Sequence, residues 1–132
     1  MKPSFLSSTT VHDDRGSLSA LEITQQTGVL IRRLFWLHDL TGSDRGGHAH
    51  IDTDQVLLLI SGSLTITLEH ESQNYLYELT PSSPPLFLPK LTWVEMKKIT
   101  NTTIVLIASS TSYDIDKSLR TYEEYSAYVQ QK

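Results

Sequence analysis

Two histidines placed two residues apart are the side chains in this chain best suited to chemistry. His48 and His50 close the segment GSDRGGHAH at residues 42–50. Successive side chains of an extended strand point to opposite faces, so positions i and i+2 share a face. The pattern therefore predicts two neighbouring imidazoles, which would act either as two metal ligands or as an acid/base pair. Imidazole suits both roles because it changes protonation state near neutral pH.

Composition narrows the classes of protein to which the chain can belong. With 132 residues and 39% hydrophobic content, it has the size of one domain with a proper core. It has no cysteine, which excludes a disulfide scaffold, a thiolate metal site and a cysteine nucleophile. The net charge of −4 argues against a nucleic-acid partner, and no apolar run is long enough to span a membrane. Without cysteines or an N-terminal signal pattern, we expect a cytoplasmic protein.

The elements that must position the histidines are expected to be strands. Segments rich in Leu, Ile, Val, Thr and Tyr lie at residues 17–22, 29–38, 55–61, 64–69, 75–79, 86–88 and 103–109. Turn residues separate them, notably Ser-Gly-Ser at 61–63 and Ser-Ser-Pro-Pro at 82–85. Many short strands at this spacing are typical of an all-β sandwich or barrel.

Only the C-terminus has a helical pattern. Thr121 and Glu124 have the spacing of a capping box, in which the two residues satisfy free N–H groups at a helix start. Tyr122, Tyr125 and Val129 follow at i, i+3 and i+7, so they would share one face of a short helix.

The spacing around the histidines resembles the first motif of the cupins, G-x5-H-x-H-x4-E-x6-G. Gly42, His48, His50 and Gly62 match it, and Gln55 stands where Glu is usual. The resemblance implies a jelly-roll barrel with the site inside, in agreement with the expected strands.

In metal cupins a later P-x-G-x-x-H motif adds a third histidine. Here Leu91 replaces that Gly and Val94 replaces that His, while Gln55 replaces the anionic ligand. Two imidazoles and an amide are too few and too weak for a tight Zn or Fe site. We therefore expect a metal-free site and no cofactor.

A closer resemblance covers nearly the whole chain. It is carried by DRGSL at 14–18, RGGHAH at 45–50, QV at 55–56, SGS at 61–63, FLP at 87–89, WVEM at 93–96 and the tail at 113–125. These segments resemble the sugar 3,4-ketoisomerase cupins. The resemblance implies a metal-independent isomerase that converts dTDP-4-keto-6-deoxyglucose to a 3-keto sugar, a precursor of amino sugars in bacterial surface polysaccharides. It also implies a homodimer that exchanges N-terminal strands.

Residue by residue, the resemblance makes His48 and His50 the catalytic pair and Arg45 the conserved arginine ahead of them. Arg33 and Arg45 are the candidates for binding the pyrophosphate, because guanidinium groups bind phosphate oxygens in a bidentate fork. Either Arg45 or the Gln55 amide could stabilise charge that develops on the substrate oxygen.

Trp36 and His38 stand where the family has aromatic hydroxyls, and they share strand parity. Either could face the cavity, and Trp36 could stack on thymine or on the sugar. Ser17 and Val94 also depart from the family, which has a larger or more polar side chain at the first position and a basic one at the second. The sugar and the C4 configuration of the product therefore stay open.

Other interpretations stay open at this stage. An epimerase would use the same enolate chemistry, a sugar-nucleotide-binding cupin would use none, and a metal-dependent cupin would use the histidines as ligands. Arg33 could be a surface charge, Gln55 an internal hydrogen-bonding residue, Trp36 an interface residue and His38 an ordinary strand histidine.

Overall fold

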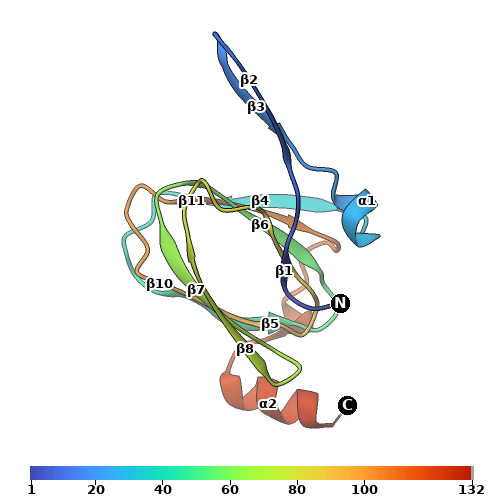
Figure 1. The fold of residues 1–132 in the computed structure, drawn as a ribbon. Helices are drawn as coiled ribbons and strands as arrows, with labels where there is room; N and C mark the ends of the chain where they lie inside the picture. The colour runs from blue at the N-terminus through green and yellow to red at the C-terminus, as the bar shows by residue number, and fades with distance from the viewer. Residues whose placement is uncertain (132) are drawn as a thin grey trace.

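A computed structural model describes residues 1–131, which form two five-stranded antiparallel sheets packed face to face (Figure 1). The strands are β1 (Ser4–Phe5), β2 (Thr9–Asp13), β3 (Gly16–Ala20), β4 (Arg33–Leu37), β5 (Arg45–His50), β6 (Gln55–Ser61), β7 (Leu64–His70), β8 (Gln73–Leu79), β9 (Leu86–Leu88), β10 (Trp93–Lys97), β11 (Ile104–Ser109) and β12 (Ser118–Leu119). The helices are α1 (Ile23–Thr27), the 3₁₀ turn η1 (Ile115–Lys117) and α2 (Tyr122–Gln130). The expected all-β jelly roll with a short C-terminal helix is confirmed.

The two sheets enclose the core between them. One has the order β1-β9-β6-β11-β4 and the other the order β12-β5-β10-β7-β8. Strand β7 alternates buried and half-buried residues, so Leu64, Ile66 and Leu68 all face the opposite sheet. Removing such apolar side chains from water is the main force that holds the sheets together.

Strands β6 and β9 have the predicted bounds, but β4 begins four residues later than expected. Ile31 packs in the apolar cluster of Leu6 and Val56 on one side of the first sheet, whereas Phe35 and Leu37 pack in the core on its other side. A continuous strand would place all three odd-numbered residues on one face. The chain must therefore leave strand geometry before Arg33 in order to change sides.

The N-terminal region differs most from the expectation. The strand predicted at 17–22 is β3 of a hairpin, and its partner β2 was not predicted. This hairpin rises away from the two sheets (Figure 1), and every residue of β2 and β3 is exposed. Helix α1 was also missed, so the expectation of a helix only at the C-terminus is wrong. It is a single short turn of helix, closed by Gly28 at a φ of 75°.

The predicted C-terminal helix is confirmed as α2. The Thr121 hydroxyl accepts a hydrogen bond from the Glu124 N–H at 3.1 Å, as the capping pattern requires. Tyr125 is buried, and its hydroxyl lies 3.0 Å from the carbonyl oxygens of both Glu69 and Leu91. These bonds fix α2 against the outer side of the second sheet. No helix within residues 1–131 is long and apolar enough to cross a membrane.

Candidate active site

His48 and His50 project side by side into the space between the sheets. Their ring centroids lie 5.1 Å apart with an angle of 72° between the ring planes. Ala49, between them on β5, is fully buried on the other side against Trp93 and Tyr125. This alternation confirms the predicted strand geometry of the histidine pair.

A β-bulge brings Arg45 to the same side. Arg45 pairs with Met96 and His48 pairs with Val94, so three steps along β5 match two steps along β10. The extra residue lies at the Gly46-Gly47 pair, where φ is 90° and 71°. Glycine adopts such angles without the steric penalty of a side chain. Arg45 consequently lines the same cavity as His48.

The opposite wall of the site is a row of polar residues across three neighbouring strands. Ser109 on β11 pairs with Arg33 on β4 and with Gln55 on β6. The Gln55 side-chain amide lies 3.1 Å from the Ser109 hydroxyl, and both side chains are buried. The internal hydrogen bond considered for Gln55 is thus present.

Gln55 also lines two small cavities. One has a volume of about 110 Å³ and is lined by His48, Arg45 and Val94 together with core residues. The other, of about 20 Å³, is lined by His50 and Arg33 together with residues of the segment after β11. Arg33, Arg45, Gln55 and both histidines therefore form one site inside the barrel.

Both imidazoles have a lowered pKa. Burial lowers the pKa of His48, aided by the charges of Arg120 and Arg45 and opposed by a hydrogen bond to the Gly46 backbone. Burial also lowers the pKa of His50 to about 4, followed by the effects of His48, Arg33 and Arg120, with Asp52 acting in the opposite direction. Both rings are consequently neutral at pH 7, the form in which an imidazole can accept a proton.

The histidines lie in the field of three arginines. Arg33, Arg45 and Arg120 all influence one or both rings, and within residues 1–131 none of the three has a carboxylate at ion-pair distance. The site is thus locally basic in a chain of net charge −4. Arg120 was not among the predicted site residues, although it lies in the family-like tail. Its position follows from β12, where Ser118 pairs with His50.

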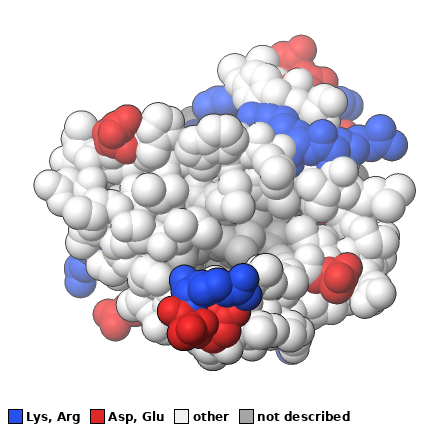
Figure 2. Space-filling view, turned by 90° about the horizontal axis from the view of Figure 1, so that it is seen from above, with Lys and Arg blue, Asp and Glu red and all other residues white. Residues whose placement is uncertain are grey.

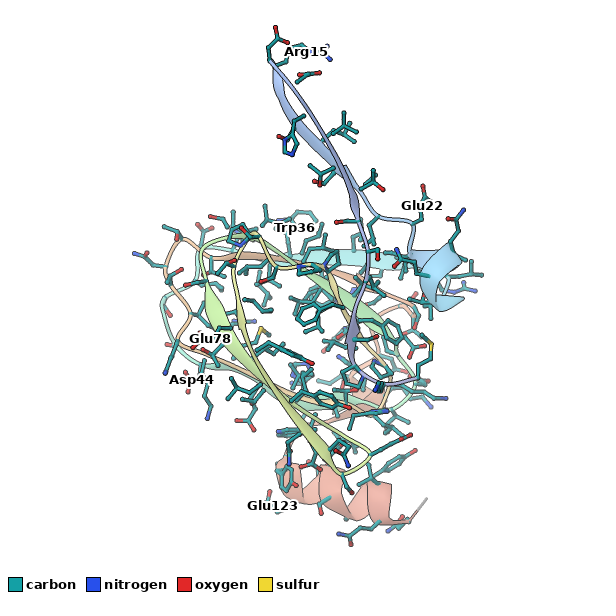
Figure 3. All side chains as sticks on the ribbon, in the orientation of Figure 1. Arg15, Glu22, Trp36, Asp44, Glu78 and Glu123 are labelled. Atoms are coloured by element: carbon teal, nitrogen blue, oxygen red, sulfur yellow. The ribbon has the colours of Figure 1, made fainter. Side chains whose placement is uncertain are left out.

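Trp36 and His38 do not face this cavity, which corrects their expected placement. Residues of β4 alternate, and Phe35 and Leu37 are the ones that line the cavity. The side chain of Trp36 lies on the outer side of β4 (Figure 3) and is 58% exposed. His38 is exposed as well and lies 2.9 Å from the Asp39 carboxylate. In a single chain neither residue can stack on a ligand bound beside the histidines.

Of the two other positions that depart from the family, one lines the cavity and the other does not. Val94 lies directly opposite His48 and lines its cavity, whereas Ser17 is on the projecting hairpin. Across residues 1–131 no three His, Cys, Asp or Glu side chains are grouped so that they could hold a metal ion.

The jelly roll with a histidine pair inside it defines a cupin. The chain belongs to the FdtA family of WxcM-like proteins, because the family model described as "FdtA: WxcM-like, C-terminal" matches residues 1–130. The predicted family is thereby confirmed.

Several proteins similar to this chain are sugar ketoisomerases. The TDP-4-oxo-6-deoxy-alpha-D-glucose-3,4-oxoisomerase of Aneurinibacillus thermoaerophilus is 31% identical over 120 residues, covering 89% of this chain and 85% of that protein. The crystal structure of a 3,4-ketoisomerase from Helicobacter canadensis is 30% identical, with a TM-score of 0.90 and 98% of each chain covered. The ketoisomerase QdtA from Thermoanaerobacterium thermosaccharolyticum, solved in complex with TDP, is 25% identical, with a TM-score of 0.89 and coverage of 98% and 96%.

Proposed function

We propose that this protein is a 3,4-ketoisomerase acting on a 4-keto-6-deoxyhexose linked to thymidine diphosphate (TDP). The observation that carries the proposal is the pair of neutral imidazoles, His48 and His50, at 5.1 Å from each other inside a barrel with three arginines around them. Membership of a family whose characterised relatives isomerise TDP-sugars supports the same conclusion.

The reaction moves a carbonyl from C4 to C3 of the sugar. One histidine removes the proton from C3, which the neighbouring C4 carbonyl acidifies, and O4 gains a proton to give an enediol. The O3 hydroxyl then gives up its proton while C4 receives one. C4 is reduced and C3 is oxidised within the same molecule, so no external oxidant is needed. Two imidazoles can divide the transfers at carbon and at oxygen between them.

The arginines supply charge where the substrate and its intermediate are negative. Arg45 lines the cavity of His48, so we assign it to the oxygen that becomes negative during enolisation. Arg33 lines the neighbouring cavity with His50 and is assigned to the diphosphate. Gln55 lines both cavities and is assigned to a hydroxyl of the sugar.

We also propose that two copies form a dimer by exchanging their N-terminal hairpins. An isolated two-stranded hairpin is at best marginally stable in water, yet Val11 and Leu18 on β2 and β3 are 58% and 64% exposed. Strand β4 is one of the two edge strands of the first sheet and carries exposed Leu34 and Trp36 on its outer side. Figure 2, seen from the hairpin's side, shows few charges in the middle of this face. A partner hairpin would complete the edge and cover both residues.

The decisive test is turnover of TDP-4-keto-6-deoxyglucose in D2O, followed by NMR, with His48→Asn and His50→Asn as variants. The wild type should take up deuterium and form a 3-keto product. Loss of a general acid or base typically reduces a rate by about 10²–10⁴-fold, and we expect this for both variants with TDP binding retained. Full activity in both variants would overturn the assignment of the histidines.

The same spectra distinguish the other readings. Exchange at C3 or C5 without carbonyl transfer would mean an epimerase. Binding of the sugar nucleotide without any exchange would mean a non-catalytic cupin.

A further inference from the structure

The side chain of Arg33 is in contact with two aromatic rings at the edge of the site. Its guanidinium carbon Cζ lies 4.5 Å from the centroid of the Phe35 ring and 5.1 Å from that of the Tyr113 ring. Both distances are within the range of a cation–π interaction, which arginine makes more often than lysine. The two rings therefore restrict the positions that the guanidinium can take.

The two rings reach Arg33 from different parts of the chain. Phe35 follows Arg33 by two residues on β4 and also packs against the core. Tyr113 comes from the segment between β11 and η1, and it lines the smaller cavity together with Arg33, His50 and Gln55. Phe35 is thus part of the barrel, whereas Tyr113 belongs to the connection that closes over the cavity.

The segment that carries Tyr113 is held at both ends. On one side, the hydroxyl of Thr111 lies 2.6 Å from that of Thr53. On the other side, the Asp114 carboxylate accepts a hydrogen bond from the Asp116 N–H at 3.0 Å and begins η1. The last residue of η1, Lys117, is tied to the barrel because its carbonyl accepts a hydrogen bond from the Ile51 N–H at 2.9 Å. Tyr113 itself is 59% exposed, so burial of its own surface does not explain its placement. Its ring instead makes the cation–π contact with the Arg33 guanidinium.

We infer that Tyr113 is a positioning residue, which holds the Arg33 guanidinium ready for the diphosphate of the sugar nucleotide. This inference deepens the proposed function and rests on it for the identity of the ligand. Arg33 has no carboxylate at ion-pair distance within the described residues 1–131, so its N–H donors are available for phosphate oxygens. An arginine side chain loses rotamer entropy when it is fixed. A ring that restricts it beforehand leaves less of this entropy to be lost on binding.

The placement of Arg33 also affects His50. The positive charge of Arg33 is one of the causes that keep the pKa of His50 low, after burial and the neighbouring His48. If the guanidinium drifts away from the site, His50 should become easier to protonate. The position of Arg33 can therefore be followed through His50 even when no substrate is turned over.

The test compares Tyr113→Leu, which removes the ring, with Tyr113→Phe, which keeps it and removes only the hydroxyl. TDP binding is measured by calorimetry on the full-length protein. We expect Tyr113→Leu to weaken binding about two- to fivefold, which corresponds to ~0.5–1 kcal/mol for an exposed cation–π contact. Tyr113→Phe should bind TDP as tightly as the wild type does. Equal weakening in both variants would show that the hydroxyl matters instead of the ring and would overturn the inference.

Two further measurements separate positioning from a general structural effect. In the free protein, Tyr113→Leu should shift the NMR titration of His50 upward by a few tenths of a pH unit, and Tyr113→Phe should not. In an Arg33→Ala background, Tyr113→Leu should have no further effect on TDP binding. If Tyr113→Leu still weakens binding there, Tyr113 does not act through Arg33.

Failure of this inference can be distinguished from failure of the proposed function. The titration of His50 and the binding of TDP need no turnover. A wild-type protein that binds TDP but isomerises no 4-keto sugar would refute the proposed function and leave the Tyr113 results interpretable. An active enzyme whose TDP affinity and His50 titration are unchanged by Tyr113→Leu would refute only the positioning role.

Discussion

Arg45 and His48 point into the same cavity although they are three positions apart along β5. In a regular strand an odd separation would place them on opposite faces. The bulge at Gly46-Gly47 removes this conflict, because the partners Met96 and Val94 are only two residues apart and face the core together. The two glycines thus decide whether the Arg45 guanidinium stands next to the His48 imidazole.

Replacing Gly46 with Ala should damage both stability and activity. A Cβ at Gly46 would lie 2.7 Å from the Val94 carbonyl oxygen, and the φ of 90° is unfavourable for any L side chain. Backbone strain of about 1–2 kcal/mol and overpacking of about 1–3 kcal/mol predict a loss of about 2–5 kcal/mol in unfolding free energy. Denaturant unfolding measures this. Gly28→Ala, with a φ of 75° and no atom within 4 Å, is the control and should show only the strain. Equal losses in both variants would mean that the contact with β10 is unimportant.

Much of the fold could be predicted from the sequence because strand alternation is a local property. Strands β6 and β9 were placed with their exact bounds, and α2 was placed by its cap and its tyrosine face. Strand β2 and helix α1 were missed because neither has an apolar pattern of its own. Helix α1 is held from outside, because the Gln26 side-chain amide accepts a hydrogen bond from the Ser7 N–H at 2.8 Å and donates one to the Ser7 carbonyl at 2.7 Å. Such tertiary support leaves no local signal.

Within the site, the histidine pair was predicted by spacing alone, but the faces of other residues were not. The parity of Trp36 and His38 was right, while the face they share depends on where β4 begins. That point is set by the change of side between Ile31 and Arg33, which involves contacts with distant residues. Arg120 was missed for the same reason, since only the pairing of β12 with β5 brings it near the histidines.

The titration of His50 should reveal the charge of the site. Because burial and nearby positive charge lower its pKa to about 4, we expect the free protein to show this value by NMR of the imidazole carbons. Bound TDP is an anion and favours the imidazolium, so it should raise the pKa. The unfolded chain binds more protons than the folded one between about pH 4 and 6.5. Stability should therefore decrease as the pH falls through this window. A titration near 6.5 that TDP leaves unchanged would contradict the proposed site.

Gln55→Glu should change the chemistry of the site towards that of a metal-binding cupin. A carboxylate in this wall would favour protonation of the histidines and raise the pKa of His50, while its repulsion of the diphosphate should weaken TDP binding. Two imidazoles and one carboxylate also form the donor set of many non-heme iron sites. We expect calorimetry to show that the variant has gained affinity for Fe²⁺ or Zn²⁺.

The wild type should keep its activity after treatment with a chelator. Loss of that activity, followed by its recovery when a metal is added, would contradict a metal-free mechanism.

The outer side of β4 should be required for dimer formation. Trp36 and Leu76 are both exposed apolar residues, at 58% and 64%, but Leu76 lies on β8 in the other sheet. Trp36→Glu places a charge where the partner hairpin is proposed to pack, and an unpaired charge is strongly disfavoured in a buried interface. Light scattering after gel filtration should show a dimer for the wild type and for Leu76→Glu, and a monomer or a concentration-dependent mixture for Trp36→Glu. A stable Trp36→Glu dimer would mean that the two copies meet elsewhere, and the exposed β2–β3 hairpin would then need a different partner.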